Sequence, residues 1–262
     1  MEPVAVPQPS QRRALVRRPA RNLADGLLTH IERTEVDPAL AETQWRGYVA
    51  ALAAEGWETI EVEPAPELPD SVFIEDAVIM FGDLAVVASP GAETRRGETA
   101  GAEAAVARLG IPLEHLDLPG TLDGGDVLKV GRTVYVGRSL RTNDEGIAAL
   151  RGILAPRGYT VVPVPISRAL HLKTAVTALP DGTVIGFPPL VDDPSVFETF
   201  LPVPEAHGTA VVVLDDRTVL MSSAAPLSAE LFARRGYRVV TVDISEFEKL
   251  EGCVTCLSVR VR

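Results

Sequence analysis

Cysteine is scarce in this chain, which has only Cys253 and Cys256 among its 262 residues. Two cysteines three positions apart do not form a disulfide framework, so a reducing cytoplasm fits the sequence. Long apolar runs are also missing, because stretches such as residues 210–214 are far too short to cross a membrane. The first ten residues lack the apolar segment of a secretory signal, and we expect residues 1–12 to be a flexible lead-in.

Clustered positive charge is absent as well. The chain has 25 Lys and Arg residues against 36 Asp and Glu residues, which gives a net charge of −11, and the basic residues are scattered. Affinity for nucleic acid depends on clustered Lys and Arg, so nucleic acid is a poor candidate partner. Hydrophobic residues make up 46% of the chain, enough for the core of one domain or two small ones.

A pattern of helix, strand and hairpin recurs about five times. In the first unit Asp37 and Pro38 predict a helix start, and a strand and a hairpin over residues 72–88 follow. The fourth unit has only weak helix signals near residues 194–200. Units of this size bury their apolar faces by stacking or by closing into a ring, which a strand at residues 13–16 could complete. An ordinary α/β sheet with regular spacing is the alternative.

Cys256 stands just before residues 257–262, whose alternating pattern predicts a strand. A thiol in such a fixed place, with histidine and aspartate elsewhere in the chain, is a candidate nucleophile. The spacing to Cys253 also allows a redox pair or half of a zinc site. A thioredoxin-type pair needs a helix after it, and zinc needs two further ligands nearby, so we disfavour both.

Two segments could supply the partners of the thiol. Asp123 is followed by two glycines and Asp126, which would let the backbone approach a ligand closely, although a solvated turn would look the same. His171 is flanked by leucines, so we expect it to be partly buried. A purely structural histidine is the alternative reading.

Charged residues in apolar or loop segments complete the candidate site. Glu75 and Asp76 lie within an apolar segment predicted as a strand, so they should face opposite sides, and Asp70 comes just before. A buried carboxylate needs a cationic partner, either a ligand or an internal arginine. Arg95 and Arg141 are loop arginines of the kind that bind a carboxylate in a two-point fork, unless they are solvated surface charges.

Six segments together resemble the dimethylarginine dimethylaminohydrolases, a family of the guanidino-modifying (amidinotransferase or pentein) superfamily. They are residues 68–76, 90–96, 120–127, 170–174, 243–247 and 255–258. The resemblance covers most of the chain and implies an α/β fold, a five-fold pseudosymmetric α/β propeller of ββαβ units, with residues 1–262 as a single catalytic domain. The chain lacks room for the helical insertion of the longer arginine deiminases.

The resemblance also implies a mechanism. Cys256 attacks the guanidinium carbon of an Nω-methylated arginine and forms a covalent S-alkylthiouronium intermediate. His171 protonates the departing methylamine or dimethylamine and then activates water, while Asp123 orients His171. Citrulline is the second product, and neither a cofactor nor a metal is implied. Covalent attack divides one difficult step into two easier ones.

The same resemblance assigns residues to the substrate. Asp76 holds the guanidinium, Asp70 helps to bind the substrate, and Glu75 lies against the nucleophile. Arg95 and Arg141 clamp the α-carboxylate, which disfavours agmatine as a substrate.

The implied lid is segment 20–28, with Leu23 as the lid leucine and Leu27 as second choice. Glu251 is an implied substrate contact, whereas Cys253 has no role in the resemblance. The expected partner is therefore a small molecule, with no nucleic acid or membrane, and a homodimer is left open, as is the preference between methylated and unmethylated arginine. Two alternatives remain: an arginine deiminase-like hydrolase and a non-catalytic guanidine-binding protein.

Overall fold

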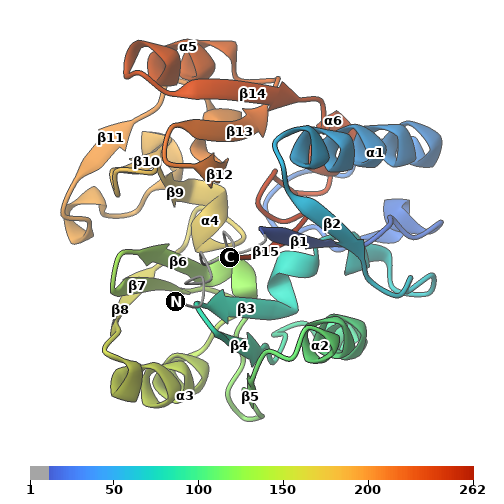
Figure 1. Ribbon diagram of the computed structural model, residues 1–262, viewed down its shortest axis with the longest axis vertical. Helices are drawn as coiled ribbons and strands as arrows, with labels where there is room; N and C mark the ends of the chain where they lie inside the picture. The colour runs from blue at the N-terminus through green and yellow to red at the C-terminus, as the bar shows by residue number, and fades with distance from the viewer. Residues whose placement is uncertain (1–11) are drawn as a thin grey trace, which may run out of the picture.

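Five small sheets surround a common centre. The computed structural model describes residues 12–262, so most of the predicted lead-in, residues 1–11, lies outside the described residues. Within that range the strands form five sheets of three strands each. Figure 1 shows these sheets in a ring, with the longer helices on its outside. The predicted propeller of five ββαβ units is confirmed.

Every sheet is built in the same way, with a middle strand that pairs antiparallel on one side and parallel on the other. The middle strands are β1 (Arg13–Val16), β4 (Leu84–Val87), β7 (Thr133–Arg138), β10 (Val184–Gly186) and β13 (Thr218–Ser222). Their antiparallel partners are β15 (Val259–Val261), β3 (Val78–Phe81), β6 (Val127–Val130), β9 (Val176–Ala178) and β12 (Val211–Asp215). Their parallel partners are β2 (Glu58–Glu61), β5 (Leu113–His115), β8 (Thr160–Pro165), β11 (Phe200–Pro202) and β14 (Arg238–Val242).

A helix leads from the middle strand to the parallel strand in four units: α1 (Pro38–Ala54), α2 (Thr99–Arg108), α3 (Asp144–Leu154) and α5 (Pro226–Arg234). Helix α1 begins at Pro38 because the Asp37 carboxylate accepts hydrogen bonds from the amides of Ala39 and Leu40, at 2.9 and 3.1 Å. In the fourth unit the 3₁₀ turns η7 (Pro188–Leu190) and η8 (Pro194–Val196) replace the helix, in keeping with its weak helix pattern. No helix in the described part of the chain is long and apolar enough to cross a membrane.

Short helical turns connect the remaining elements and carry several polar site residues, namely Asp70, Glu75, Asp76 and Arg95. These turns are α4 (Leu172–Ala175), α6 (Ser245–Glu248), η1 (Leu23–Asp25), η2 (Pro69–Val72), η3 (Ile74–Asp76), η4 (Glu93–Glu98), η5 (Gly124–Asp126), η6 (Ala155–Arg157) and η9 (Ala206–Thr209).

Strand β1 closes the ring, as predicted, by pairing with β15 and with β2. Side chains alternate along a strand, so β1 contributes to two core clusters. Ala14 and Val16 pack in the cluster that includes Trp45 of α1, whereas Leu15 packs in the cluster that includes Ala102 of α2. The strand that follows Cys256 is thereby fixed between two units of the core.

One predicted strand is wrong in its first half. Residues 72–80 begin with the turns η2 and η3, and only β3 is extended. A hydrogen bond from the Phe73 amide to the Asp70 carbonyl, at 3.0 Å, is typical of these turns. The apolar pattern arises because every residue of this segment is buried, not because alternate residues share a face. The side chains of Glu75 and Asp76 therefore project from a 3₁₀ turn and not from a strand.

Candidate active site

A small cavity of about 20 Å³ gathers most of the predicted site residues. It is lined by Leu27, Asp70, Phe73, Asp76, Arg95, Arg141, Leu170, His171, Leu250, Glu251, Gly252 and Cys256. These residues come from segments far apart in the sequence, so the ring brings them together. A volume of this size holds about one water molecule, which means that an amino acid can enter only after a wall has moved.

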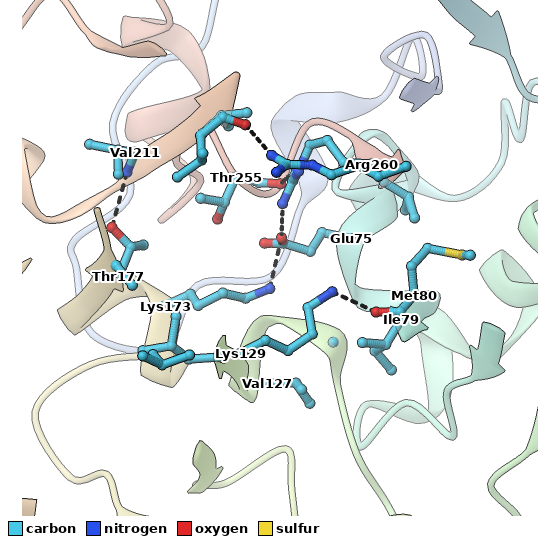
Figure 2. Close-up of a pocket in the computed structure, with 18 of the residues that line it drawn as sticks. Glu75, Ile79, Met80, Val127, Lys129, Lys173, Thr177, Val211, Thr255 and Arg260 are labelled. Carbon is cyan, nitrogen blue, oxygen red and sulfur yellow. Dashed lines mark hydrogen bonds and ion pairs between the residues drawn. The ribbon is translucent and has the colours of Figure 1, made fainter. Parts of the chain in front are cut away.

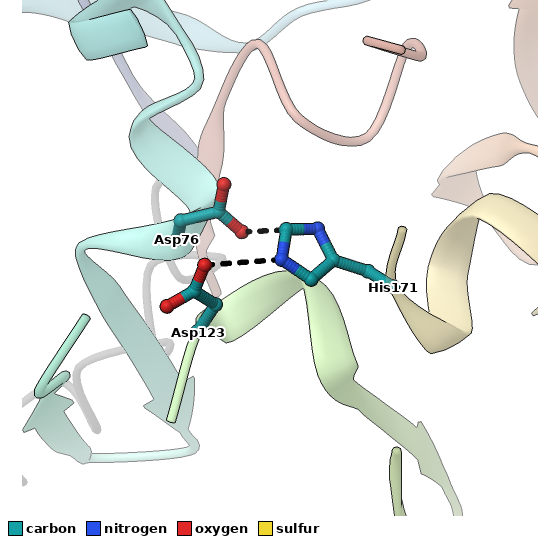
Figure 3. A group of neighbouring side chains, drawn as sticks. All are labelled: Asp76, Asp123 and His171. Atoms are coloured by element: carbon teal, nitrogen blue, oxygen red, sulfur yellow. Dashed lines mark hydrogen bonds and ion pairs between the residues drawn. The ribbon is translucent and has the colours of Figure 1, made fainter. Parts of the chain in front are cut away.

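His171 stands at the start of α4 and its ring faces two neighbouring carboxylates (Figure 3). Its Nε2 is 3.0 Å from Asp123 Oδ2, and its Nδ1 is 3.9 Å from Asp76 Oδ1. Gly125 permits this packing, since a Cβ there would lie 2.5 Å from His171 Nδ1 and 2.7 Å from Asp76 Oδ1. The Gly125 amide instead donates a hydrogen bond to Asp76 Oδ1, at 2.8 Å. The solvated turn considered for Asp123 is excluded, because its side chain is fully buried.

These carboxylates keep His171 protonated. Burial opposes the imidazolium charge, but Asp76, Asp126 and Asp123 outweigh it and raise the pKa of His171 to about 9. Burial likewise opposes the charge of Asp76, whose pKa His171 and Arg95 nevertheless lower to about 2. Buried Asp126 also accepts from the Leu172 amide, at 2.8 Å, and so fixes the start of α4. The site therefore holds an acidic proton on His171 at neutral pH.

The same three side chains meet the geometric requirement for a metal ion, since ligand atoms of Asp76, Asp123 and His171 lie within 4.8 Å of one another. Both carboxylates nevertheless already have partners within the protein. Asp76 binds Arg95 and the Gly125 amide, and Asp123 binds His171 and, at 2.9 Å, the Gly91 amide. This arrangement fits an imidazolium better than a metal ion, and the absence of a metal stays a prediction.

Cys256 is 7% exposed and lies in a turn just before β15. The turn is closed by the Cys256 amide, which donates to the Cys253 carbonyl at 3.1 Å, and the two Sγ atoms are 3.3 Å apart. The contact with Cys253, together with burial and the negative charges of Glu75 and Asp76, raises the pKa of Cys256 well above its usual value. Cys253, to which the sequence assigned no role, is thus in direct contact with the candidate nucleophile.

The two predicted arginines differ in how their donors are used. Arg95 donates to Asp76 Oδ2 at 2.7 Å and to both carboxylate oxygens of Glu98 at 3.0 and 2.8 Å. Buried Arg141 has an Nη1 without a hydrogen-bond partner, and this atom lies 3.8 Å from Asp123 Oδ2. Arg141 is thus the arginine with a free donor at the cavity. Sequence reasoning missed Glu98, although its spacing of three residues from Arg95 was a usable signal.

Glu75 faces a different and larger cavity of about 370 Å³, which also contacts Lys129, Lys173 and Arg260. Figure 2 shows its carboxylate between Lys173 and Arg260, and both cations bind Oε1, at 2.7 and 2.8 Å. The backbone of Glu75 contacts the nucleophile, since its amide donates to the Cys256 carbonyl at 3.2 Å. Glu75 and Asp76 do point into different spaces, as the strand interpretation had supposed. Sequence reasoning missed Lys173, because no local signal marks its distant partner.

Segment 20–28 brings Leu27 to the cavity, but not Leu23. Leu23 is fully buried in the core cluster, because η1 turns its side chain inward, whereas Leu27 follows four residues later. The Leu27 amide donates to both oxygens of Asp70, at 3.1 and 3.2 Å. Glu251 accepts from the amides of Thr29 and His30, at 2.5 and 3.0 Å. Two carboxylates of the cavity wall thus hold this segment.

Fold and site together define a class of protein. In a ring of five ββαβ units, one cavity joins a buried thiol, an imidazolium and carboxylates suited to a planar cation. These features define a guanidino-modifying enzyme of the pentein type.

Comparisons with known proteins identify the family within that class, although no family model matches the sequence. The chain is 61% identical over 251 residues to N(G),N(G)-dimethylarginine dimethylaminohydrolase of Streptomyces coelicolor, covering 96% of this chain and 97% of the relative. A solved cysteine-to-serine variant of the Pseudomonas aeruginosa enzyme, complexed with citrulline, superposes with a TM-score of 0.88 at 35% identity, covering 95% and 98% of the two chains. A solved histidine-to-glycine variant of a dimethylarginine dimethylaminohydrolase, present as an adduct with S-methyl-L-thiocitrulline, superposes with a TM-score of 0.88 at 35% identity, covering 95% of this chain and 98% of that one. The chain belongs to the dimethylarginine dimethylaminohydrolase family.

Proposed function

We propose that this chain hydrolyses Nω-methylated arginine to citrulline and methylamine or dimethylamine. The observation that carries the proposal is one cavity that contains the thiol of Cys256, the protonated His171 and the buried carboxylate of Asp76. Family membership supports the same substrate. Asp76 is the carboxylate best placed for the guanidinium, since its low pKa keeps it charged.

The chemistry begins with a neutral thiol, because the pKa of Cys256 is raised in the free protein. A guanidinium bound beside it favours the thiolate, so the substrate itself promotes ionisation of the nucleophile. The Cys256 sulfur bonds to the guanidinium carbon, and the C–N bond breaks as His171 gives its proton to the departing amine. Neutral His171 then takes a proton from water, whose oxygen attacks the same carbon. As the carbonyl of citrulline forms, the C–S bond breaks and the hydroxyl proton passes to the departing sulfur, which restores the thiol and releases citrulline. The proton that the thiol gave to solvent at the start is balanced by the proton that the released amine takes from solvent.

Access to the cavity requires the segment around Leu27 to move. Its backbone amides donate hydrogen bonds to the carboxylates of Asp70 and Glu251. Water or the α-amino group of a substrate can replace these amides as donors. Burial raises the pKa of Asp70, and an ammonium group nearby would favour its charged form. We therefore assign Asp70 to the α-amino end of the substrate.

A panel of guanidines, assayed for the released amine or ammonia and, for the arginines, for citrulline, tests the proposed function. The panel holds monomethylarginine, dimethylarginine, arginine and methylated agmatine, and citrulline is expected from the methylated arginines. Citrulline from arginine alone would favour the deiminase-like activity. Calorimetric binding without any product or covalent adduct would instead favour a guanidine-binding protein.

The free donor of Arg141 predicts a binding defect. In Arg141→Gln the α-carboxylate loses a charge-assisted hydrogen bond, so KM for dimethylarginine should rise about 10- to 100-fold. Turnover of methylated agmatine, which has no carboxylate, should not change. The control is Arg138→Gln, since Arg138 is half-exposed and pairs with Asp144. Equal effects on both substrates would contradict the assignment, and the part of Arg95 in the clamp stays a prediction.

The pKa of His171 predicts the alkaline limb of the pH profile. The proposed step needs the imidazolium, so kcat/KM should fall as pH rises through about 9, where His171 loses its proton. Asp123→Asn removes one of the carboxylates that raise this pKa, and the fall should then begin at lower pH. Measuring kcat/KM against pH for both proteins tests this. An alkaline limb that stays at the same pH in the variant would contradict it.

A further inference from the structure

Both cysteines of the chain meet at the edge of the active site. We propose that Cys253 and Cys256 form a peroxide-reactive dithiol, in which a reversible disulfide between them removes the nucleophile. The proposed reaction does not use Cys253, which does not line the small cavity. It is half-buried, whereas Cys256 is buried.

The backbone places the two thiols at bonding range. Their Sγ atoms are 3.3 Å apart, so they need to approach by only about 1.3 Å to reach the length of a disulfide. The hydrogen bond from the Cys256 amide to the Cys253 carbonyl closes a turn, and residues in such a turn have Cα atoms within about 7 Å. Disulfides form at Cα separations of about 4.4 to 6.8 Å.

Neighbouring contacts hold this turn in place. Tyr48 Oη donates to the Val254 carbonyl at 2.9 Å, and Arg260 Nη1 donates to the Thr255 carbonyl at 3.0 Å. Gly252 packs against Phe73 so closely that a Cβ there would lie 2.3 Å from the ring. The turn therefore presents the thiols as a fixed pair, which favours bonding between them over reaction with a distant thiol.

The two thiols differ in reactivity. The hydrogen bond from Cys256 lowers the pKa of Cys253 to about 7, so a substantial fraction of Cys253 is thiolate near neutral pH. The thiolate is the form that reacts with peroxide. Cys253 is thus the first thiol to be oxidised, and Cys256 is the thiol that resolves the product.

The oxidant is hydrogen peroxide, and the reaction balances in two steps. The Cys253 thiolate attacks one peroxide oxygen, the O–O bond breaks, and hydroxide leaves with a sulfenic acid on Cys253. The Cys256 sulfur then attacks the sulfenic sulfur, the S–O bond breaks, and the departing hydroxide takes the Cys256 proton. The first hydroxide gains a proton from solvent. Overall, two thiols and one peroxide yield one disulfide and two waters, and a dithiol reductant reverses the oxidation.

The full chain, treated with hydrogen peroxide after removal of reductant, tests the proposal. Intact mass should fall by two hydrogen atoms, titratable thiols should fall from two to none, and a peptide linking the cysteines should appear. These readouts do not depend on the proposed function. Citrulline formation, which does depend on it, should fall in parallel and should return fully with dithiothreitol.

Cys253→Ser and Cys253→Ala are the matched variants, since both leave the cavity lining unchanged. Each should turn over substrate to the same order as the wild type and should lose activity to peroxide at least several-fold more slowly. Inactivation of both variants at the wild-type rate would overturn the proposal. Oxygen addition to the wild type without loss of two hydrogens would also overturn it. A protein that forms the disulfide but never releases citrulline would refute only the proposed function.

Discussion

Cys256→Ser should lower citrulline formation about 10⁴-fold or more, because a serine hydroxyl in this cavity has no partner that makes it a nucleophile. The carboxylates that already raise the pKa of Cys256 would oppose an alkoxide even more strongly. The exchange keeps the size of the side chain. We therefore expect the thermal midpoint to fall by no more than about 2–4 °C, which corresponds to about 1 kcal/mol. Steady-state citrulline assays and thermal unfolding measure the two effects.

The matched control for this variant lies three residues earlier in the chain. Cys253→Ser makes the same chemical change at the other thiol, which contacts Cys256 at 3.3 Å but lies outside the cavity lining. Turnover of the same order as the wild type is expected there. If Cys256→Ser kept substantial activity, or if both variants lost activity equally, Cys256 would not be the nucleophile.

His171→Gln should lower kcat about 10²- to 10⁴-fold, because glutamine cannot give the departing amine a proton or take one from water. S-methyl-L-thiocitrulline separates these two roles. Its methanethiolate leaves without a proton donor, so the variant should still form the covalent adduct with Cys256. Hydrolysis of that adduct lacks its base, so the adduct should accumulate and be visible in the intact mass.

His115→Gln is the control for the histidine variant. His115 is exposed, its Nε2 is 3.0 Å from Glu103, and neither residue lines the small cavity. Its substitution should leave kcat unchanged. Wild-type kcat in His171→Gln, or a comparable loss in His115→Gln, would contradict the assigned role of His171.

Elements that depend on local signals were predictable from the sequence. Asp37 and Pro38 start α1 through interactions within four residues, and hairpin turns fall at Gly82 and Gly131, whose φ angles of +64° and +58° suit glycine. The pairing of residues 13–16 with the last strand was also predictable, because only that pairing closes a ring of such units.

Features that depend on tertiary contacts were not predictable in the same way. Segment 72–80 is buried on all sides, so its apolar pattern no longer distinguishes a strand from a turn. The choice between Leu23 and Leu27 depends on how η1 rotates against the core. The contact of Cys253 with Cys256 depends on the turn geometry of the folded chain. The spacing of the two cysteines alone is also compatible with a redox pair or with half of a zinc site.

The pairing of β1 with β15 has a consequence for the rate of folding. Arg13 and Val261 are partners although they stand 248 positions apart (261 minus 13). In the other four sheets the antiparallel pair is a hairpin of two consecutive strands. Contacts between distant segments form slowly, because the entropy of closing a long loop is lost before the contact forms. Cys256 comes just before β15, so the nucleophile is held in place only after β15 has paired with β1. In refolding from denaturant, helical circular dichroism should therefore recover before catalytic activity does.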